Sequence, residues 1–360
     1  MQIAITGRCN LRCKYCFYAD EMVALKDLPT ETWLNFFKQL GELGIMRVTF
    51  TGGEAFTRPD LFELIDGVIE NRMRYSILSN GTLITEKVLE QFQLGKRRLR
   101  LDYIQISIDG STADVHNQSR PKSFEHAIRG MQLLRQAGFR TVVRVTINRH
   151  NFQDLENIAG LLLDEMGLPS FGTNEAMPMG AGCENQPEIT LTADEQVIAM
   201  GILARLEERY PGRITASAGP QSKRKHFAEM EHARQTGERP TQWQMGCLSG
   251  CGGVFYNMDV LHDGTIVPCH VLTGVSLGNI TTDSLEEVWL KHPHMVALRE
   301  RRLTPMQEVL GCQDCEWAPY CNGGCPGLAY SLTGDYNRAD SHDCYRRFLF
   351  QTGAINVVRS

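Results

Sequence analysis

The sequence predicts an α/β protein: a partial (β/α)6 barrel of parallel strands, followed by a small cysteine-rich domain. Up to about residue 180, short β-branched runs alternate with helix-length amphipathic segments, a pattern typical of consecutive βα units. The twelve cysteines are unevenly placed: three precede residue 17, one stands at position 183 and eight lie between 247 and 344. Because the 360 residues exceed the length that one core usually serves, we expect a barrel over 1–184, a helical and polar connector over 185–246 and a cysteine-rich domain over 247–360.

Each barrel element follows from local composition. Strands are expected where β-branched and aromatic residues concentrate, at 2–6, 46–51, 75–79, 103–108, 141–147 and 172–177. Amphipathic segments between them predict helices that start near Thr30, Pro59, Thr85, Ser123 and Gln153, and another helix is expected over 192–209. The last third is rich in glycine and poor in periodic apolar sequence, so bound metal is expected to supply much of its folding energy.

Composition excludes several classes of protein. The net charge of -5 and the pI near 6.1 argue against binding to nucleic acid or to an anionic membrane. Short basic runs, such as 96–98 and 223–225, are expected at the solvated surface. The sequence contains neither an uninterrupted apolar stretch of membrane-spanning length nor an N-terminal signal segment. We therefore expect a cytoplasmic protein with reduced thiols rather than a secreted disulfide scaffold.

The first motif is a cysteine triplet directly after the first strand, Cys9, Cys13 and Cys16. Three thiolates leave one iron of a four-iron cluster without a protein ligand, and an open metal position distinguishes a reactive site from a closed structural one. A structural zinc ion would need a fourth ligand nearby, yet the nearest histidine is His116. The triplet therefore indicates an iron–sulfur cluster and an enzyme.

Polar and glycine-rich segments follow the next three strands, at 52–54, 79–81 and 109–110. Ligands of parallel α/β sheets bind beyond the carboxyl ends of the strands, so these segments and the cysteine triplet are expected at one rim. Gly52 and Gly53 allow close approach of the backbone to a ligand, and Glu54 offers an acceptor for an ammonium group.

CxxxCxxC after the first strand and GGE after the second together resemble the radical S-adenosylmethionine (SAM) superfamily. The resemblance implies that SAM chelates the open iron and that one electron from the cluster releases a 5'-deoxyadenosyl radical, which abstracts hydrogen from a substrate. Arg120 closes a stretch that resembles the HxxxR segment of the family, whose arginine commonly meets the SAM carboxylate. The cofactor-binding residues implied are Gly52, Gly53, Glu54, Ser79, Asn80, Ser107, Asp109, Arg120 and Tyr15.

The later cysteines resemble the SPASM extension of radical enzymes, which holds two auxiliary 4Fe-4S clusters. With Cys247 added they form two sets of four, and family analogy implies the following assignment: Cys247, Cys251, Cys269 and Cys325 for the first cluster, and Cys312, Cys315, Cys321 and Cys344 for the second. Spacing alone would instead group residues 312, 315, 321 and 325, which a zinc ribbon would also explain. The remaining cysteine, Cys183, is either an ordinary free thiol or a hydrogen donor to a substrate radical.

Families with this extension mostly act on peptides and proteins, so the resemblance implies a radical SAM maturase of a ribosomally synthesised precursor peptide. The modification can be a cross-link, a thioether, an epimerisation or excision of a tyrosine-derived fragment, as in peptide spliceases. Alternatives are a sulfatase-maturing enzyme that forms formylglycine, an enzyme that oxidises haem or another small molecule and, from a different class, a zinc-binding module without catalysis.

Partners follow from the same resemblance. One residue precedes the first predicted strand, which leaves no room for the leader-binding domain of many peptide maturases. We therefore expect a separate small peptide-recognition protein, and an electron donor such as flavodoxin or ferredoxin.

Overall fold

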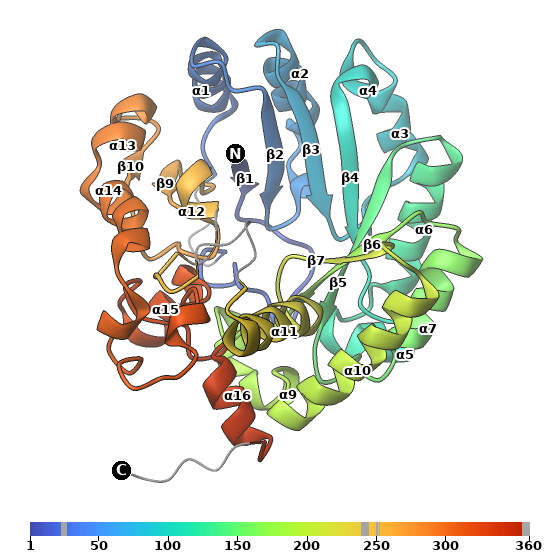
Figure 1. Cartoon of the computed structure of the whole chain (residues 1–360). Coiled ribbons are helices and arrows are strands. Elements are labelled where there is room, and N and C mark those ends of the chain that lie inside the picture. The colour runs from blue at the N-terminus through green and yellow to red at the C-terminus, as the bar shows by residue number, and fades with distance from the viewer. Residues whose placement is uncertain (23–26, 239–244, 250, 252, 355–360) are drawn as a thin grey trace.

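The computed structural model describes residues 1–22, 27–238, 245–249, 251 and 253–354. Its centre is a ten-stranded sheet with the order β10-β9-β8-β1-β2-β3-β4-β5-β6-β7 (Figure 1). The barrel strands are β1 (Gln2–Thr6), β2 (Arg47–Gly52), β3 (Arg74–Ser79), β4 (Leu101–Ser107), β5 (Thr141–Ile147) and β6 (Phe171–Glu175). Each is parallel to its neighbour, which confirms the predicted fold class, with strand ends within two residues of those predicted.

Four further strands, which the sequence analysis did not predict, extend the sheet at both edges. β7 (Ile214–Ala216) lies in the predicted connector and pairs parallel with β6. At the other edge β8 (Asp259–Val260) pairs parallel with β1, and β9 (Thr265–Val267) and β10 (Gly278–Asn279) continue antiparallel. β1 therefore pairs with the barrel strand β2 on one side and with β8, from the cysteine-rich part of the chain, on the other.

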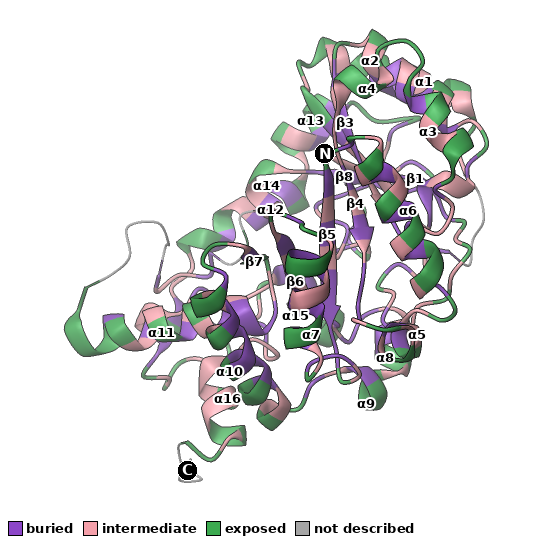
Figure 2. Ribbon diagram, turned by 90° about the vertical axis from the view of Figure 1, so that its right-hand side faces the viewer, coloured by how far each residue is buried: buried purple, intermediate pink, exposed green. Residues whose placement is uncertain are grey.

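Helices cover the outer side of the barrel strands. They are α1 (Thr30–Glu42), α2 (Leu61–Glu70), α3 (Glu86–Phe92), α4 (Arg97–Arg100), α5 (Ala113–Ser119), α6 (Phe124–Gln136) and α7 (Leu155–Ala159). Trp33, Phe36 and Phe37 of α1 are fully buried, and Phe37 contacts Phe50 of β2. Figure 2 shows the resulting gradient: the central strands are buried, whereas the helices expose one face. The alternating pattern of the sequence is thus satisfied by a core between sheet and helices.

The helices that follow β6 along the chain are α8 (Ala181–Glu184), α9 (Gln186–Ile189), α10 (Ala193–Arg209), α11 (Pro220–Thr236), α12 (Gly253–Tyr256), α13 (Leu285–Lys291), α14 (Pro293–Glu300), α15 (Pro326–Thr333) and α16 (Tyr345–Gln351). α10 begins with a capping box in which Thr192 and Glu195 satisfy each other's backbone N–H groups. Phe227 of α11 stacks on Tyr345 of α16 at 4.6 Å between ring centroids. The connector helix α11 therefore packs directly on the cysteine-rich part. None of the described helices has the length and apolar character needed to cross a bilayer.

Candidate cluster and cofactor sites

The loop that carries Cys9, Cys13 and Cys16 is fixed from two sides. Lys14 N donates to Ser119 O at 3.0 Å, and Ala181 N donates to Cys16 O at 3.0 Å. Burial raises the pKa of Cys16 to about 12, with further contributions from the neighbouring Cys13 and Cys9. The three thiols thus lie within electrostatic reach of one another, an arrangement that fits the three-thiolate ligand set of an iron–sulfur cluster.

Gly52 and Gly53 lie where the end of β2 crosses the start of this loop. Gly53 N donates to Thr6 O at 2.9 Å and Glu54 N to Arg8 O at 2.7 Å. A Cβ atom on Gly53 would lie 2.1 Å from Arg8 O, and one on Gly52, whose φ is +126°, would lie 2.3 Å from Thr6 O. The glycines are therefore required for close approach of the cysteine loop to the strand, a reason more specific than the ligand contact expected from sequence.

The buried Glu54 carboxylate joins the ends of β2 and β3. It accepts hydrogen bonds from Ser79 Oγ at 2.9 Å, Asn80 N at 2.7 Å and Phe56 N at 3.3 Å. Asn80 Nδ2 in turn donates to Asn10 Oδ1 at 2.9 Å, next to Cys9. The structure therefore brings Glu54, Ser79 and Asn80 together beside the cysteine loop.

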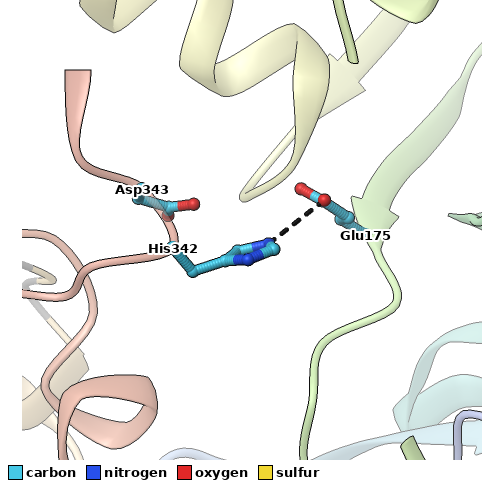
Figure 3. Close-up of side chains that lie close together, drawn as sticks. All are labelled: Glu175, His342 and Asp343. Atoms are coloured by element: carbon cyan, nitrogen blue, oxygen red, sulfur yellow. Dashed lines mark hydrogen bonds and ion pairs between the residues drawn. The ribbon is translucent and has the colours of Figure 1, made fainter. Parts of the chain in front are cut away.

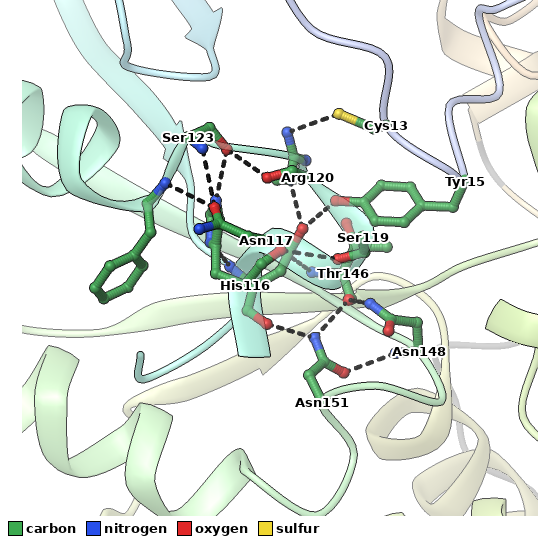
Figure 4. Close-up of polar contacts among 12 residues, drawn as sticks. Cys13, Tyr15, His116, Asn117, Ser119, Arg120, Ser123, Thr146, Asn148 and Asn151 are labelled. Atoms are coloured by element: carbon green, nitrogen blue, oxygen red, sulfur yellow. Dashed lines mark hydrogen bonds and ion pairs between the residues drawn. The ribbon is translucent and has the colours of Figure 1, made fainter. Parts of the chain in front are cut away.

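A second buried carboxylate, Asp109, follows β4 and organises the other side of the loop, where Figure 4 shows Tyr15, Arg120 and Cys13 close together. It accepts hydrogen bonds from Tyr15 Oη, Arg120 Nε and, at 2.6 Å, Thr146 N. Arg120 Nη1 lies 3.8 Å from Cys13 Sγ, so this guanidinium is fixed beside the thiols by a carboxylate of the chain itself. Ser107 lies in β4 opposite Arg144 and outside these contacts.

His116 supports Asp109 through the backbone. Its Nδ1 accepts from Asp109 N at 3.0 Å and its Nε2 lies 3.0 Å from Ser123 Oγ. Burial lowers the pKa of His116 to about 4, so the ring is neutral at physiological pH. With Nδ1 as the acceptor, Nε2 carries the proton and donates to Ser123. The histidine of the HxxxR-like stretch is thus a positioning group in this structure.

The later thiols form two groups. Burial raises the pKa of Cys269 to about 12, and Cys325 and Cys251 are among the neighbours that raise it further. Burial likewise raises the pKa of Cys321 to about 12, and its thiol neighbours are Cys344, Cys312 and Cys315. Cys325 therefore lies with Cys251 and Cys269, which favours the crossed grouping over the one suggested by spacing.

Cys247 is placed by a β-bridge to Pro305, and Leu248 N donates to Thr304 O at 2.9 Å. Cys183 lies in α8 with an exposed side chain, and its Sγ donates to Pro178 O at 3.0 Å. Gly180, with φ +54°, packs directly on the backbone of Cys16. The segment that carries Cys183 thus contacts the first cysteine loop, although the thiol itself is directed to a backbone carbonyl.

The sequence analysis missed a buried charge cluster formed by Glu175, Lys223, His342 and Asp343. Figure 3 shows Glu175, at the end of β6, facing His342 and Asp343 from the segment before Cys344. Lys223 Nζ lies 2.7 Å from Glu175 Oε2 and 2.9 Å from Asp343 Oδ1, and His342 Nε2 lies 3.2 Å from Glu175 Oε1. The Lys223 ammonium group therefore supplies a positive charge to both carboxylates of this cluster.

The basic run 223–225 was expected at the solvated surface, and for Lys223 this prediction is wrong. Its side chain is only 4% exposed. Burial opposes ionisation of Glu175, but Lys223 and His342 more than offset it and lower the pKa of this carboxyl to about 2. No local sequence signal joins these residues, since they come from β6, α11 and the C-terminal segment.

The amino-acid sequence matches the family model of the radical SAM superfamily over residues 3–162 and that of the SPASM iron–sulfur cluster-binding domain over residues 251–316. An AdoMet-dependent heme synthase of Methanosarcina barkeri (strain Fusaro / DSM 804) is 28% identical over 353 residues, which cover 95% of each chain. A PqqA peptide cyclase of Granulibacter bethesdensis is 26% identical over 344 residues, which cover 93% of this chain and 84% of that protein.

Several solved structures share the fold, and two of them illustrate the similarity. Streptococcus suis SuiB bound to precursor peptide SuiA has a TM-score of 0.72 at 15% identity, covering 96% of this chain and 75% of SuiB. Native anSMEcpe with bound AdoMet and the Cp18Cys peptide has a TM-score of 0.69 at 17% identity, covering 98% and 96% of the two chains. The barrel and the cysteine-rich part therefore occur together in this arrangement in other proteins.

Proposed function

Because the chain is an enzyme with a radical SAM domain followed by a SPASM domain, we propose that it modifies a ribosomally synthesised precursor peptide by hydrogen abstraction. Its cofactors are SAM and three 4Fe-4S clusters, one that binds SAM and two auxiliary. When bound, SAM and the first cluster supply the radical that removes a hydrogen atom from the substrate. The observation that carries the proposal is the group of three thiols near two buried carboxylates, Glu54 and Asp109, which follow β2 and β4, the strands on either side of β3.

The residues of this chain have distinct roles in the proposal. Cys9, Cys13 and Cys16 hold the SAM-binding cluster. Glu54, oriented by Ser79 and Asn80, accepts from the SAM ammonium, and Arg120, oriented by Asp109, faces the SAM carboxylate. The other cofactor contacts proposed are Gly52, Gly53, Ser107 and Tyr15.

Each auxiliary cluster takes one of the two cysteine groups. Cys247, Cys251, Cys269 and Cys325 are proposed for the first, and Cys312, Cys315, Cys321 and Cys344 for the second. The proximity of Cys325 to Cys251 and Cys269 supports this division.

A peptide substrate has three lines of support. The PqqA peptide cyclase aligns with nearly the whole chain, and SuiB holds a precursor peptide within the same fold. The described sheet also ends at β7, and an extended peptide can pair with such an edge strand. A small peptide-recognition protein and a flavodoxin or ferredoxin remain proposed partners, and the cytoplasm, which keeps thiols reduced, remains the proposed compartment.

A second candidate function is haem synthesis, because the Methanosarcina heme synthase is similar over 95% of both chains. The two candidates separate in one anaerobic experiment. The reconstituted enzyme is given SAM, a reductant and either a precursor peptide encoded beside its gene or an iron porphyrin precursor of haem.

We expect 5'-deoxyadenosine together with a mass change in the peptide. Conversion of the porphyrin with no change in the peptide would contradict the peptide proposal and support haem synthesis. Absence of 5'-deoxyadenosine with every substrate would contradict radical chemistry itself. Efficient turnover of the full precursor by this chain alone would exclude the need for a recognition partner.

A further inference from the structure

Arg301 is a buried arginine with no hydrogen-bond partner for its guanidinium group. It begins the short 3-10 helix Arg301–Leu303 after α14 and is 2% exposed. Within the part of the chain that the structure describes, its Nε, Nη1 and Nη2 atoms all lack a partner. Among the described residues, no other buried side chain has three nitrogen atoms without a hydrogen-bond partner.

A buried arginine without hydrogen-bond partners destabilises the folded protein unless another group contacts its guanidinium. A guanidinium keeps its proton in proteins and presents five N–H donors in a planar fork. A buried charge without a partner strongly destabilises the folded state. A group that the amino acids themselves do not provide is therefore expected beside Arg301, and it must accept hydrogen bonds and carry negative charge.

The position of Arg301 identifies that group. Thr304 N donates to Arg301 O at 3.0 Å, Leu248 N donates to Thr304 O at 2.9 Å, and Cys247 forms a β-bridge with Pro305. The 3-10 helix is thus tied to the strand-like segment that carries the first of the later cysteines.

The charged groups near the guanidinium also indicate a group bound by the later cysteines. Burial lowers the pKa of Arg301, while Cys325, Asp335, Tyr336 and Cys251 act in the opposite direction, with Cys325 first among them. Asp335 is half-exposed and its carboxylate lies 3.8 Å from Arg338, and Tyr336 Oη lies 2.9 Å from His294 Nδ1. The two cysteines remain as the groups toward which a buried cation is directed.

We infer that Arg301 donates hydrogen bonds to the sulfur atoms of the auxiliary cluster held by Cys247, Cys251, Cys269 and Cys325 and raises the reduction potential of that cluster. A 4Fe-4S cluster with four thiolates carries net negative charge, and reduction adds one more electron. A fixed cation and N–H donors at the sulfurs stabilise the reduced form more than the oxidised form. The inference rests on the proposed cysteine assignment and is independent of the substrate.

The test compares the reconstituted full-length enzyme with Arg301→Met, which keeps an unbranched apolar stem and removes the charge. Arg302→Met is the matched control, because Arg302 is the exposed neighbour in the same helix. The midpoint potentials of the clusters are measured by potentiometric titration, with electron paramagnetic resonance as the detection method. The signals of the auxiliary clusters are identified as those that do not change when SAM is added.

In Arg301→Met we expect the midpoint potential of one auxiliary cluster to fall by about 59 mV or more. For a one-electron couple this shift corresponds to a tenfold change in the reduction equilibrium. The other potentials and the Arg302→Met control stay unchanged. Full iron content in Arg301→Met with every midpoint potential unchanged would overturn the inference.

A second measurement starts from the unmutated enzyme, so the outcome that would contradict the inference does not depend on whether a variant assembles its clusters. Wild-type protein is labelled with 15N-arginine and reduced, and hyperfine spectroscopy detects nitrogen close to a paramagnetic cluster. A 15N coupling to an auxiliary cluster that disappears in Arg301→Lys supports the inference, and its absence from the wild-type spectrum contradicts it. Because neither measurement uses peptide or porphyrin, failure here leaves the proposed function untouched.

Discussion

Replacing Glu175 by glutamine tests the buried charge cluster that joins β6, α11 and the segment before Cys344. The pKa of Glu175 lies at about 2, against an ordinary 4.5, because Lys223 and His342 favour the carboxylate despite its burial. At about 1.4 kcal/mol per pKa unit, this difference corresponds to roughly 3 kcal/mol of folding free energy at neutral pH. Glu175→Gln should therefore lower the free energy of unfolding by about 3 kcal/mol.

The sign of the pH dependence follows from the lowered pKa. A carboxyl whose pKa is depressed in the folded state contributes its full stabilisation above its ordinary pKa of 4.5, and the contribution is lost as the pH falls toward 2. The difference between wild type and Glu175→Gln should thus shrink below about pH 4.5. It should also decline as the pH rises through the titration of His342, because burial lowers the pKa of this imidazole but its hydrogen bond to Glu175 and the nearby carboxylates raise it overall.

The assay is urea unfolding of the reconstituted protein under anaerobic conditions, followed by tryptophan fluorescence. Glu156→Gln is the control, because the pair between Glu156 and Arg205 has a similar distance of 2.8 Å but both side chains are more than half exposed. An exposed pair contributes at most about 1 kcal/mol. If Glu175→Gln and Glu156→Gln lower the free energy of unfolding equally at neutral pH, burial does not make the Glu175 ion pairs more stabilising than the exposed pair.

Three other substitutions test the site around the first cysteine loop. Gly53→Ala should abolish 5'-deoxyadenosine formation, because the added Cβ would lie 2.1 Å from Arg8 O. The control Gly160→Ala should stay active, since its Cβ would meet no atom within 4 Å. Equal activity of the two variants would contradict the packing argument. Asp109→Asn leaves Arg120 without its buried counter-charge and should cost roughly 3 to 5 kcal/mol in urea unfolding, while the exposed Asp114→Asn should cost little. Cys183→Ala should remove deuterium incorporation from solvent into the product if this thiol is the hydrogen donor, and unchanged incorporation would show that it is an ordinary thiol.

The sequence predicted the barrel because each of its strands carries a local signal, a β-branched run bounded by turn residues. β7 and β8 escaped prediction since they contain three and two residues, too few for a period to be recognised. Their existence depends on pairing with distant strands, and Gln2 N donates to Asp259 Oδ1 across 257 positions. Long-range partners of this kind are not encoded in any window of the chain.

The same distinction explains the site. Glu54, Ser79 and Asn80 were expected together because parallel strands bring their carboxyl ends to one rim, and their hydrogen bonds are the local expression of that rule. The buried position of Lys223 had no such rule behind it. A lysine within a basic run is usually solvated, and here the tertiary contacts of α11 with β6 and the C-terminal segment decide otherwise.

The shared strand β1 has a consequence for how the two cysteine-rich regions cooperate. Its pairing with β2 places Cys9 at the rim, and its pairing with β8 leads through β9 toward Cys269. Between these regions the buried Tyr18 Oη lies 2.9 Å from His262 Nδ1, which adds a side-chain contact to the backbone pairing. One continuous sheet therefore connects the proposed SAM-binding cluster to the first auxiliary cluster. Electron exchange between them would occur across a separation fixed by the sheet, so its rate should respond to the reduction potential that Arg301 sets rather than to motion of a linker.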